Sequence, residues 1–171
     1  MQASPEFVKS FWHARFPGQI PTDLVLPEPF RDDFIELEGH RLEVIPLGHT
    51  DTDDTTCLHV PSLGLVVAGD AVYNNVHLYL AESPAEGREQ WLDALDVIDN
   101  LDPRLVVAGH KDWQAPDAAS AIAETRAYIH AFARLADKAT STIDLYRAML
   151  EIYPDRINRG ALWGSARFAL G

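Results

Sequence analysis

Three polar side chains that can bind metals each follow an apolar, strand-like segment ending in glycine. They are His49 after residues 42–48, Asp70 after residues 65–69 and His110 after residues 105–109. A buried strand fixes the position of its end, and a glycine there lets the backbone turn sharply, so the next side chain projects from the sheet edge. Two imidazoles and one carboxylate match the nitrogen and oxygen ligands that zinc, iron or manganese takes. We therefore predict that these three residues hold a transition metal.

Each of the three residues also has a structural interpretation, because single histidines at strand ends are usually hydrogen-bonded and Gly-Asp is a common turn. The coincidence of three such ends favours the metal site. A calcium loop starting at Asp51 is excluded, since Thr56 would replace its glycine and Ser62 its bidentate glutamate. The carboxylates of Asp51, Asp53 and Asp54 are instead expected to lie in a solvated loop or to orient His49 by a hydrogen bond to the ring nitrogen that does not bind metal.

The elements that must position these residues follow from hydrophobic spacing. Apolar residues at helical spacing predict a helix over residues 6–16, followed by a proline-punctuated connector. Alternating or continuous apolar segments predict strands at 34–37, 42–45, 57–60, 65–68 and 105–108, with a turn at Gly39-His40. Helices are expected at 86–101, from Pro116 to Leu135 and at 143–153. The order predicts an α/β fold with a helical C-terminal third.

Composition narrows the class of protein. The 171 residues carry 14 Lys and Arg against 26 Asp and Glu, a formal net charge of −12, and 47% are hydrophobic. This fits one globular domain and disfavours nucleic acid as a partner, because binding to phosphates relies on clustered basic residues. No apolar run is long enough to cross a membrane. The single cysteine, Cys57, excludes an intrachain disulfide, and we expect a cytoplasmic protein.

Three motifs resemble the third, fourth and fifth motifs of the metallo-β-lactamase fold superfamily. They are Gly48–Asp51, Val66–Asp70 and Val106–His110, and the resemblance spans residues 30–113. It implies that His49 binds a first metal, that His110 binds a second and that Asp70 bridges both as the catalytic residue. It also implies zinc, with iron or manganese as alternatives, and two ions in a complete site that activate water for hydrolysis.

The first motif of that superfamily, His-x-His-x-Asp-His, does not occur in the sequence. The resemblance therefore implies the second half of an αββα sandwich, a mixed sheet covered by helices. We expect a single partial domain over 1–171, with a helix and connector at 1–29, a motif-bearing sheet region at 30–113 and a helical region at 114–171. Such a half exposes an apolar sheet face that requires the missing N-terminal half or a second copy of the chain.

Tyr73, Asn74, Asn75 and His77 follow the Asp70 motif directly. Their amides, phenol and imidazole are expected to line a pocket rim and orient a small-molecule substrate. The alternative is an ordinary polar loop.

Three interpretations follow. The first is the C-terminal part of a metal-dependent hydrolase, inactive or weakly active alone, because only half of the metal ligands are present and metal binding is weak or absent. The second is a non-catalytic remnant that acts as a homodimeric binding module. The third is a plain α/β domain whose resemblance is accidental.

Overall fold

The structure is a computed structural model that describes residues 5–21, 28 and 30–171, and the chain divides into two compact units, 1–32 and 33–171. In the first unit, α1 (Pro5–Phe7), a π-helix (Val8–Trp12) and α2 (His13–Arg15) form one helical segment. The ring centroids of Phe7 and Phe11 stack at 5.1 Å. The predicted helix over 6–16 is thus confirmed, and the part of the predicted connector at 22–27 and 29 lies outside the described residues.

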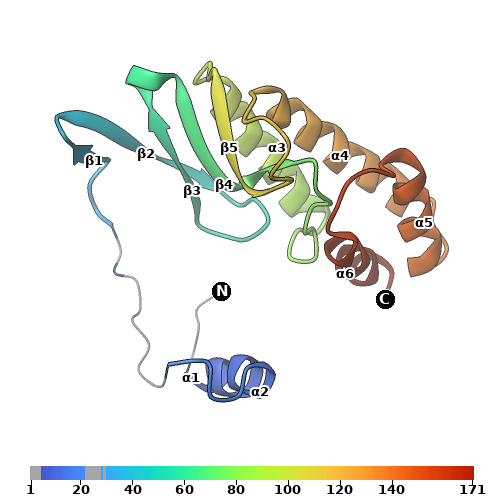
Figure 1. The fold of residues 1–171 in the computed structure, drawn as a ribbon. Helices are drawn as coiled ribbons and strands as arrows, with labels where there is room; N and C mark the ends of the chain where they lie inside the picture. The colour runs from blue at the N-terminus through green and yellow to red at the C-terminus, as the bar shows by residue number, and fades with distance from the viewer. Residues whose placement is uncertain (1–4, 22–27, 29) are drawn as a thin grey trace. The chain divides into compact units, whose positions relative to one another are not determined.

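The second unit is built on one five-stranded sheet (Figure 1). Its strands are β1 (Phe34–Leu37), β2 (His40–Gly48), β3 (Thr55–Val60), β4 (Leu65–Asn74) and β5 (Leu105–Lys111), and they lie in the order β1-β2-β3-β4-β5. Neighbours are antiparallel except β4 and β5, which are parallel. The five expected strands are confirmed. The turn between β1 and β2 falls at Glu38-Gly39 rather than at Gly39-His40. Glu38 and Gly39 both have the positive φ that a tight two-residue hairpin turn requires.

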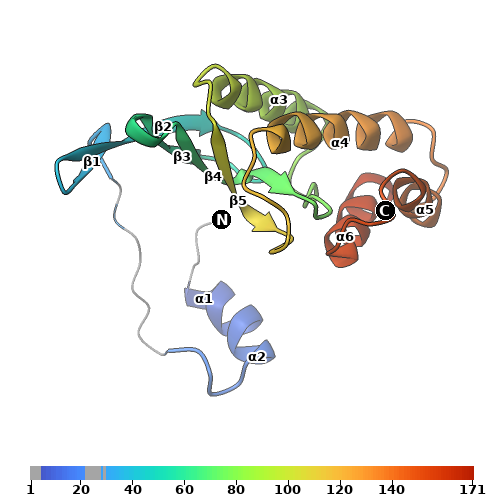
Figure 2. The same cartoon turned by 45° about the horizontal axis from the view of Figure 1, so that its top comes forward.

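Four α-helices lie in this unit: the first three match the helices expected from the sequence, and the last is expected only as part of a helical C-terminal third. They are α3 (Ala85–Asp99), α4 (Ser120–Ala136), α5 (Thr142–Ile152) and α6 (Arg159–Leu170). Figures 1 and 2 show α3 and α4 on the same face of the sheet, and both contact β4. Trp91 of α3 is fully buried there and donates its indole N–H to the Ala71 carbonyl at 2.8 Å. None of the described helices combines the length and the apolar character needed to span a bilayer.

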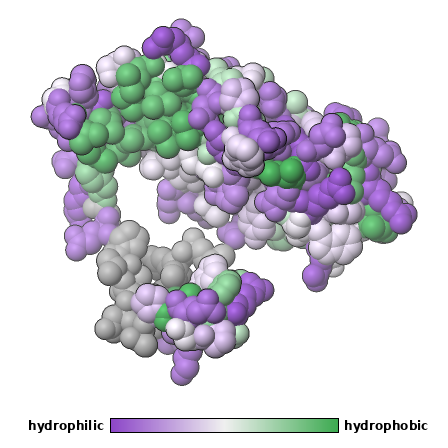
Figure 3. Space-filling view, in the orientation of Figure 1, coloured by the Kyte–Doolittle hydropathy of each residue, from purple (hydrophilic) through white to green (hydrophobic). Residues whose placement is uncertain are grey.

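The two faces of the sheet differ in what covers them. Residues that face α3 and α4 are buried, among them Cys57, Val66, Ala68, Val106 and Ala108. The strand register places apolar residues on the opposite face as well: Ile35, Leu37, Leu42, Val44, Leu58, Leu65, Val67, Leu105 and Val107. We call this set the open sheet face. Within residues 33–171 no helix packs on it, and its apolar side chains gather on the surface shown in Figure 3.

Side chains of the open sheet face are not covered by other parts of residues 33–171. Leu37 is 59% exposed, Leu105 is 46% exposed and Val67, on a central strand, is 38% exposed. A monomeric protein rarely leaves a contiguous apolar surface of this kind uncovered. Residues 33–171 therefore leave an apolar sheet face uncovered, and the partner that would cover it stays a prediction.

Candidate active site

The closest contact between predicted site residues joins Asp70 and His110. The expected strand end at Gly69 is not observed, because β4 continues to Asn74 and Asp70 lies in the middle of it. β4 and β5 run parallel, and a register shift at Gly69 brings Asp70 beside His110 of β5. His110 Nδ1 donates a hydrogen bond to Asp70 Oδ1 at 2.6 Å, although the two residues are 40 positions apart. Their side chains are 54% and 34% exposed, so the pair lies at the surface of this unit.

Two glycines make this pairing sterically possible. Gly69 has φ 54°, a left-handed conformation that favours glycine, and lies where the β4–β5 register shifts. Gly109 allows a close approach: a Cβ there would collide with Asp70 Oδ1 and lie 2.8 Å from the Gly69 carbonyl carbon. The sequence-based interpretation of glycine before each polar residue is consistent with this arrangement.

A cavity of about 330 Å³ adjoins the pair. Its lining residues are Asp51, Asp70, Tyr73, Tyr79, His110, Asn158 and Ala161. Asp51 is only 8% exposed and accepts a hydrogen bond from Thr50 Oγ1 at 3.1 Å. Burial, together with the negative charge of Asp70, raises the pKa of the Asp51 carboxyl to about 6. The cavity therefore concentrates negative charge that a cation or a proton would neutralise.

Tyr73 supports His110 from one side. The two rings stack with centroids 5.5 Å apart and planes inclined by 8°, and the tyrosine is almost completely buried. Thr125 Oγ1 accepts a hydrogen bond from the Tyr73 backbone N–H at 3.1 Å, which fixes the backbone at this point. Burial raises the pKa of the Tyr73 phenol well above its usual value, so the hydroxyl stays protonated. Tyr73 is thus the one member of the predicted substrate-binding set that lines this cavity.

The other three members of that set make contacts elsewhere. Asn74 Nδ2 donates to the Pro116 carbonyl at 2.8 Å, and Asn75 Nδ2 donates to an Asp112 carboxylate oxygen at 3.0 Å. His77 is fully buried and its Nδ1 lies 2.9 Å from the Tyr128 hydroxyl. The structure does not bring these side chains to the cavity, because the chain turns at Asn75, where φ is 55°.

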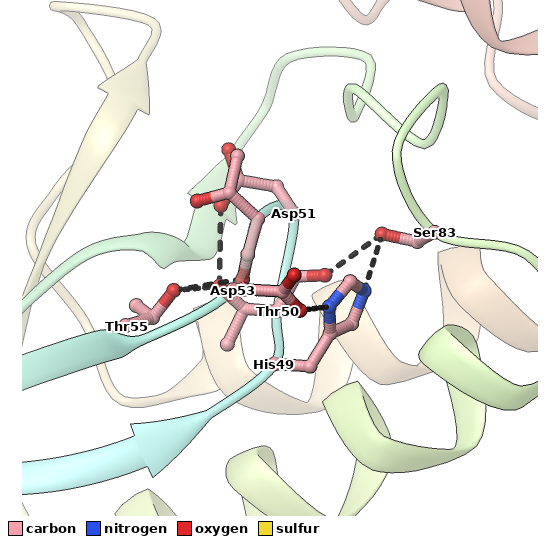
Figure 4. Close-up of polar contacts among 7 residues, drawn as sticks. His49, Thr50, Asp51, Asp53, Thr55 and Ser83 are labelled. Atoms are coloured by element: carbon pink, nitrogen blue, oxygen red, sulfur yellow. Dashed lines mark hydrogen bonds and ion pairs between the residues drawn. The ribbon is translucent and has the colours of Figure 1, made fainter. Parts of the chain in front are cut away.

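His49 is held apart from the Asp70–His110 pair. Its Nδ1 donates to Asp53 Oδ1 at 2.7 Å, and its Nε2 lies 3.2 Å from Ser83 Oγ. Figure 4 shows the imidazole beside Ser83 while the Asp51 side chain points away from it. His49 lines a different cleft, of about 530 Å³, together with Asp53. Of the three carboxylates expected in this loop, Asp53 therefore supports His49, and Asp51 reaches the cavity.

The donor groups can be tested against the metal that the sequence predicts. Among the residues that the structure describes, no group of three or more His, Cys, Asp or Glu side chains is arranged to hold a metal ion. Asp70 and His110 bind each other, and both nitrogens of His49 face other partners. The residues in this arrangement do not fit a metal, so no reaction step through a metal follows from it.

Four residues of the cavity were not among the predicted site residues. Asp51 belongs to the run of threonines and aspartates after His49, and only its burial distinguishes it from Asp53 and Asp54. Tyr79 comes from the segment after β4, and Asn158 and Ala161 come from the start of α6. Their contribution depends on how α6 packs, and nothing in local spacing indicates it.

Among the solved structures that share this fold are two metallo-β-lactamase or β-lactamase domain proteins. A metallo-β-lactamase family protein from Thermus thermophilus aligns with a TM-score of 0.60 and 21% identity over 96% of this chain and 58% of its own. A β-lactamase domain protein from Burkholderia ambifaria aligns with a TM-score of 0.55 and 18% identity over 84% of this chain and 47% of its own. The chain thus spans little more than half the length of the Thermus protein. No curated protein sequence matches it.

The sequence profile of the metallo-β-lactamase superfamily matches residues 3–110. This match covers more than half of the chain and contains all three predicted metal ligands. The mixed five-stranded sheet with its helices agrees with the same fold. The interpretation that the resemblance is accidental is therefore wrong, and the chain belongs to the metallo-β-lactamase superfamily.

Proposed function

We propose that this chain supplies the C-terminal half of a metal-dependent hydrolase of the metallo-β-lactamase superfamily and is inactive or weakly active alone. Proteins of this superfamily typically bind metal ions. The observation that carries the proposal is the Asp70–His110 pair, held at 2.6 Å beside a cavity of about 330 Å³. In the proposed complete site, His49, Asp70 and His110 are metal ligands, and Asp70 is the catalytic residue.

The open sheet face supports the incomplete nature of the site. Its central Val67 and its edge residues Leu37 and Leu105 remain exposed within the 33–171 unit. Sheets that pack face to face bury such residues in a shared core about 10 Å thick. A second sheet that carries the His-x-His-x-Asp-His motif would cover this face and bring the remaining ligands to the same edge.

The chemistry of the cavity restricts the substrate. Asp51 and Asp70 line it, and the chain carries a formal net charge of −12, so a polyanion such as nucleic acid would be repelled. A small molecule with an ester, amide or thioester bond is the substrate class we propose. Cys57 is buried and free, which supports a reducing, cytoplasmic setting.

Metal analysis tests the proposal. The chain is incubated with zinc, iron or manganese, desalted and analysed for metal per chain, alone and with a separate polypeptide that carries His-x-His-x-Asp-His and the first sheet. We expect weak binding alone and a gain in metal and hydrolysis in the mixture. His49→Ala and His110→Ala should each remove that gain, whereas His130→Ala, at an exposed position of α4, should not. A mixture that associates without gaining metal would contradict the proposal.

A second function is favoured by the open sheet face alone. Two copies that pack sheet against sheet would bury the same apolar residues and leave a homodimer that acts as a binding module. Light scattering distinguishes the two, because the module is a stable dimer that holds little metal under any loading condition. The half-enzyme gives up self-association in favour of its complement and then retains metal.

A further inference from the structure

The helical segment of the first unit carries four aromatic side chains that contact one another in series. We call Phe7, Phe11, Trp12 and Phe16 the aromatic ladder. The ring centroids lie 5.1 Å apart between Phe7 and Phe11, 5.1 Å apart between Phe11 and Trp12 and 6.1 Å apart between Trp12 and Phe16. The first and last of these pairs are four positions apart, a spacing at which helical side chains are neighbours. The ladder is therefore an ordered apolar surface.

Part of this surface is accessible. Trp12 and Phe16 are exposed, and the Arg15 guanidinium lies 3.8 Å from the centroid of the Phe11 ring. An isolated helix shorter than about 12–15 residues is marginally stable in water and takes most of its stability from packing of its apolar face. The segment α1, π-helix and α2 spans only Pro5–Arg15. The ladder is thus a surface that favours a packing partner.

The family match indicates where that partner comes from. The match to the metallo-β-lactamase superfamily begins at residue 3, so the ladder lies inside the family domain and is not an addition to it. The alignment with the Thermus thermophilus protein covers 96% of this chain but only 58% of that protein. The remainder of such a domain is a protein surface available to the ladder. A lipid surface is disfavoured, because Lys9 and Arg15 are the only lysine and arginine residues between positions 5 and 16.

We infer that the aromatic ladder is a second docking surface for the missing N-terminal half of the domain, with Trp12 and Phe16 as its anchors. The inference rests on the proposed function, in which that half is a separate polypeptide. The partner surface is apolar and offers an acceptor to the Trp12 indole N–H, since buried indoles are usually hydrogen-bonded. The other half then contacts this chain at two places, the open sheet face and the aromatic ladder.

Aromatic anchors of this kind dominate the affinity of protein interfaces, and tryptophan is the residue most enriched among them. Truncating Trp12 should therefore weaken association, although the open sheet face is untouched. Two contacts made by one chain also reinforce each other, because the first contact raises the effective concentration of the second. A ladder that serves only to stabilise its own helix predicts no change in affinity for the other half.

Isothermal titration of the full chain with the complementary polypeptide that carries His-x-His-x-Asp-His and the first sheet measures the association. Trp12→Ser removes an anchor, and Trp12→Phe keeps an aromatic ring at the same place. Trp113→Ser is the matched control, because Trp113 is also exposed but lies in the 33–171 unit, just after β5. Trypsin provides a second measurement that needs no substitution. Lys9 and Arg15 are exposed in the segment, and Lys138, exposed between α4 and α5, is the reference site.

We expect Trp12→Ser to weaken association at least tenfold, and Trp12→Phe and Trp113→Ser to stay within about twofold of the unmodified chain. Trypsin should cut the chain alone after Lys9 and Arg15. The complementary polypeptide should slow these cuts at least tenfold and leave the cut after Lys138 unchanged. Unchanged affinity in Trp12→Ser, or unchanged cleavage in the mixture, overturns the inference and leaves the half-enzyme proposal intact.

Three further outcomes assign the ladder to another occupant or reject the half-enzyme. Resistance of Lys9 and Arg15 to trypsin in the chain alone overturns the inference, and a dependence of that resistance on chain concentration would assign the ladder to a second copy. Trp12-dependent binding to vesicles that contain phosphatidylserine would assign it to a membrane and also overturns the inference. If the unmodified chain does not associate with the complementary polypeptide at all, both the inference and the proposed function are wrong.

Discussion

His110 Nδ1 and Asp70 Oδ1 lie 2.6 Å apart, and each residue directly follows the same five-residue segment, Leu-Val-Val-Ala-Gly, in the parallel strands β4 and β5. Both side chains are partly exposed, so a pairwise interaction here is screened by water and contributes about 0–1 kcal/mol. The pair is therefore poorly explained as a device for stability. Its position beside the cavity of about 330 Å³ instead favours a role in the candidate active site.

The exposure of the Asp70–His110 pair allows one variant, His110→Ala, to distinguish an effect on stability from an effect on metal binding. His110→Ala should lower the free energy of unfolding by no more than about 1 kcal/mol, because the side chain is 54% exposed. The same change should remove most of the zinc that the chain retains after loading and desalting. Urea unfolding and elemental analysis on one preparation measure both effects. Retention of the full metal content by His110→Ala would show that the Asp70–His110 pair is not part of a metal site.

Gly109 should tolerate no side chain. In Gly109→Ala the new Cβ meets Asp70 Oδ1 and the backbone of Gly69, which cannot move without disturbing β4. Overpacking of this kind costs about 1–3 kcal/mol. Denaturant unfolding measures the loss, and Gly160→Ala provides the control because its Cβ would meet nothing within 4 Å. Equal stability of the two variants would show that the strands are not held as closely as described.

The pH dependence of stability should carry the signature of His77. Burial, with the charges of Arg156 and Arg159, lowers its pKa from 6.5 to about 4, and the Tyr128 hydroxyl packs against it. In the unfolded chain the His77 imidazole takes up a proton near pH 6.5, whereas in the folded chain the same imidazole stays neutral until the pH falls to about 4. Stability is therefore unaffected above pH 6.5 and falls as the pH is lowered toward 4, by up to about 3 kcal/mol.

Chemical unfolding between about pH 4 and pH 8 measures that slope. His77→Leu should flatten it relative to the unmodified chain, even if the variant is less stable throughout. His130→Gln, at an exposed position on α4, should leave the slope unchanged. The same slope in His77→Leu as in the unmodified chain would assign the acid sensitivity to other groups.

The sequence predicts the strands and the Asp70–His110 contact because both depend on local patterns. Asp70 and His110 each directly follow a glycine after an apolar segment, and parallel pairing of β4 and β5 then brings the two positions together, although β4 continues beyond Asp70 to Asn74. The spacing does not determine the rotamer of His49. That rotamer depends on Ser83 and on the space above Gly87, and both come from a segment more than 30 residues away.

The substrate-binding prediction shows the same limit. Proximity in sequence to Asp70 suggested a polar rim at residues 73–77, but the left-handed turn at Asn75 redirects the chain. His77 is then buried against Tyr128 of α4. The cavity instead receives Asn158 and Ala161 from α6. Helix packing at long range decides these neighbours, and hydrophobic periodicity alone does not specify it.

The open sheet face provides the test of assembly. Val67 lies on a central strand of this face and is 38% exposed, so Val67→Lys should change the stability of the isolated unit only modestly. In an assembly that buries this face, the same change places an unpaired ammonium group in an apolar interface, which is strongly unfavourable. We expect self-association, or association with a complementary half, to weaken at least tenfold.

Light scattering over a range of chain concentrations measures that effect, and circular dichroism checks that the variant is folded. Phe168→Lys is the matched control, because Phe168 is 54% exposed but lies on α6 rather than on the sheet. Association that is lost in Val67→Lys and kept in Phe168→Lys assigns the interface to the open sheet face. Equal weakening by both variants would instead indicate contacts through the α5 and α6 region. If the unmodified chain is a monomer at every concentration, the homodimeric module is eliminated, and the half-enzyme is then tested with its complement.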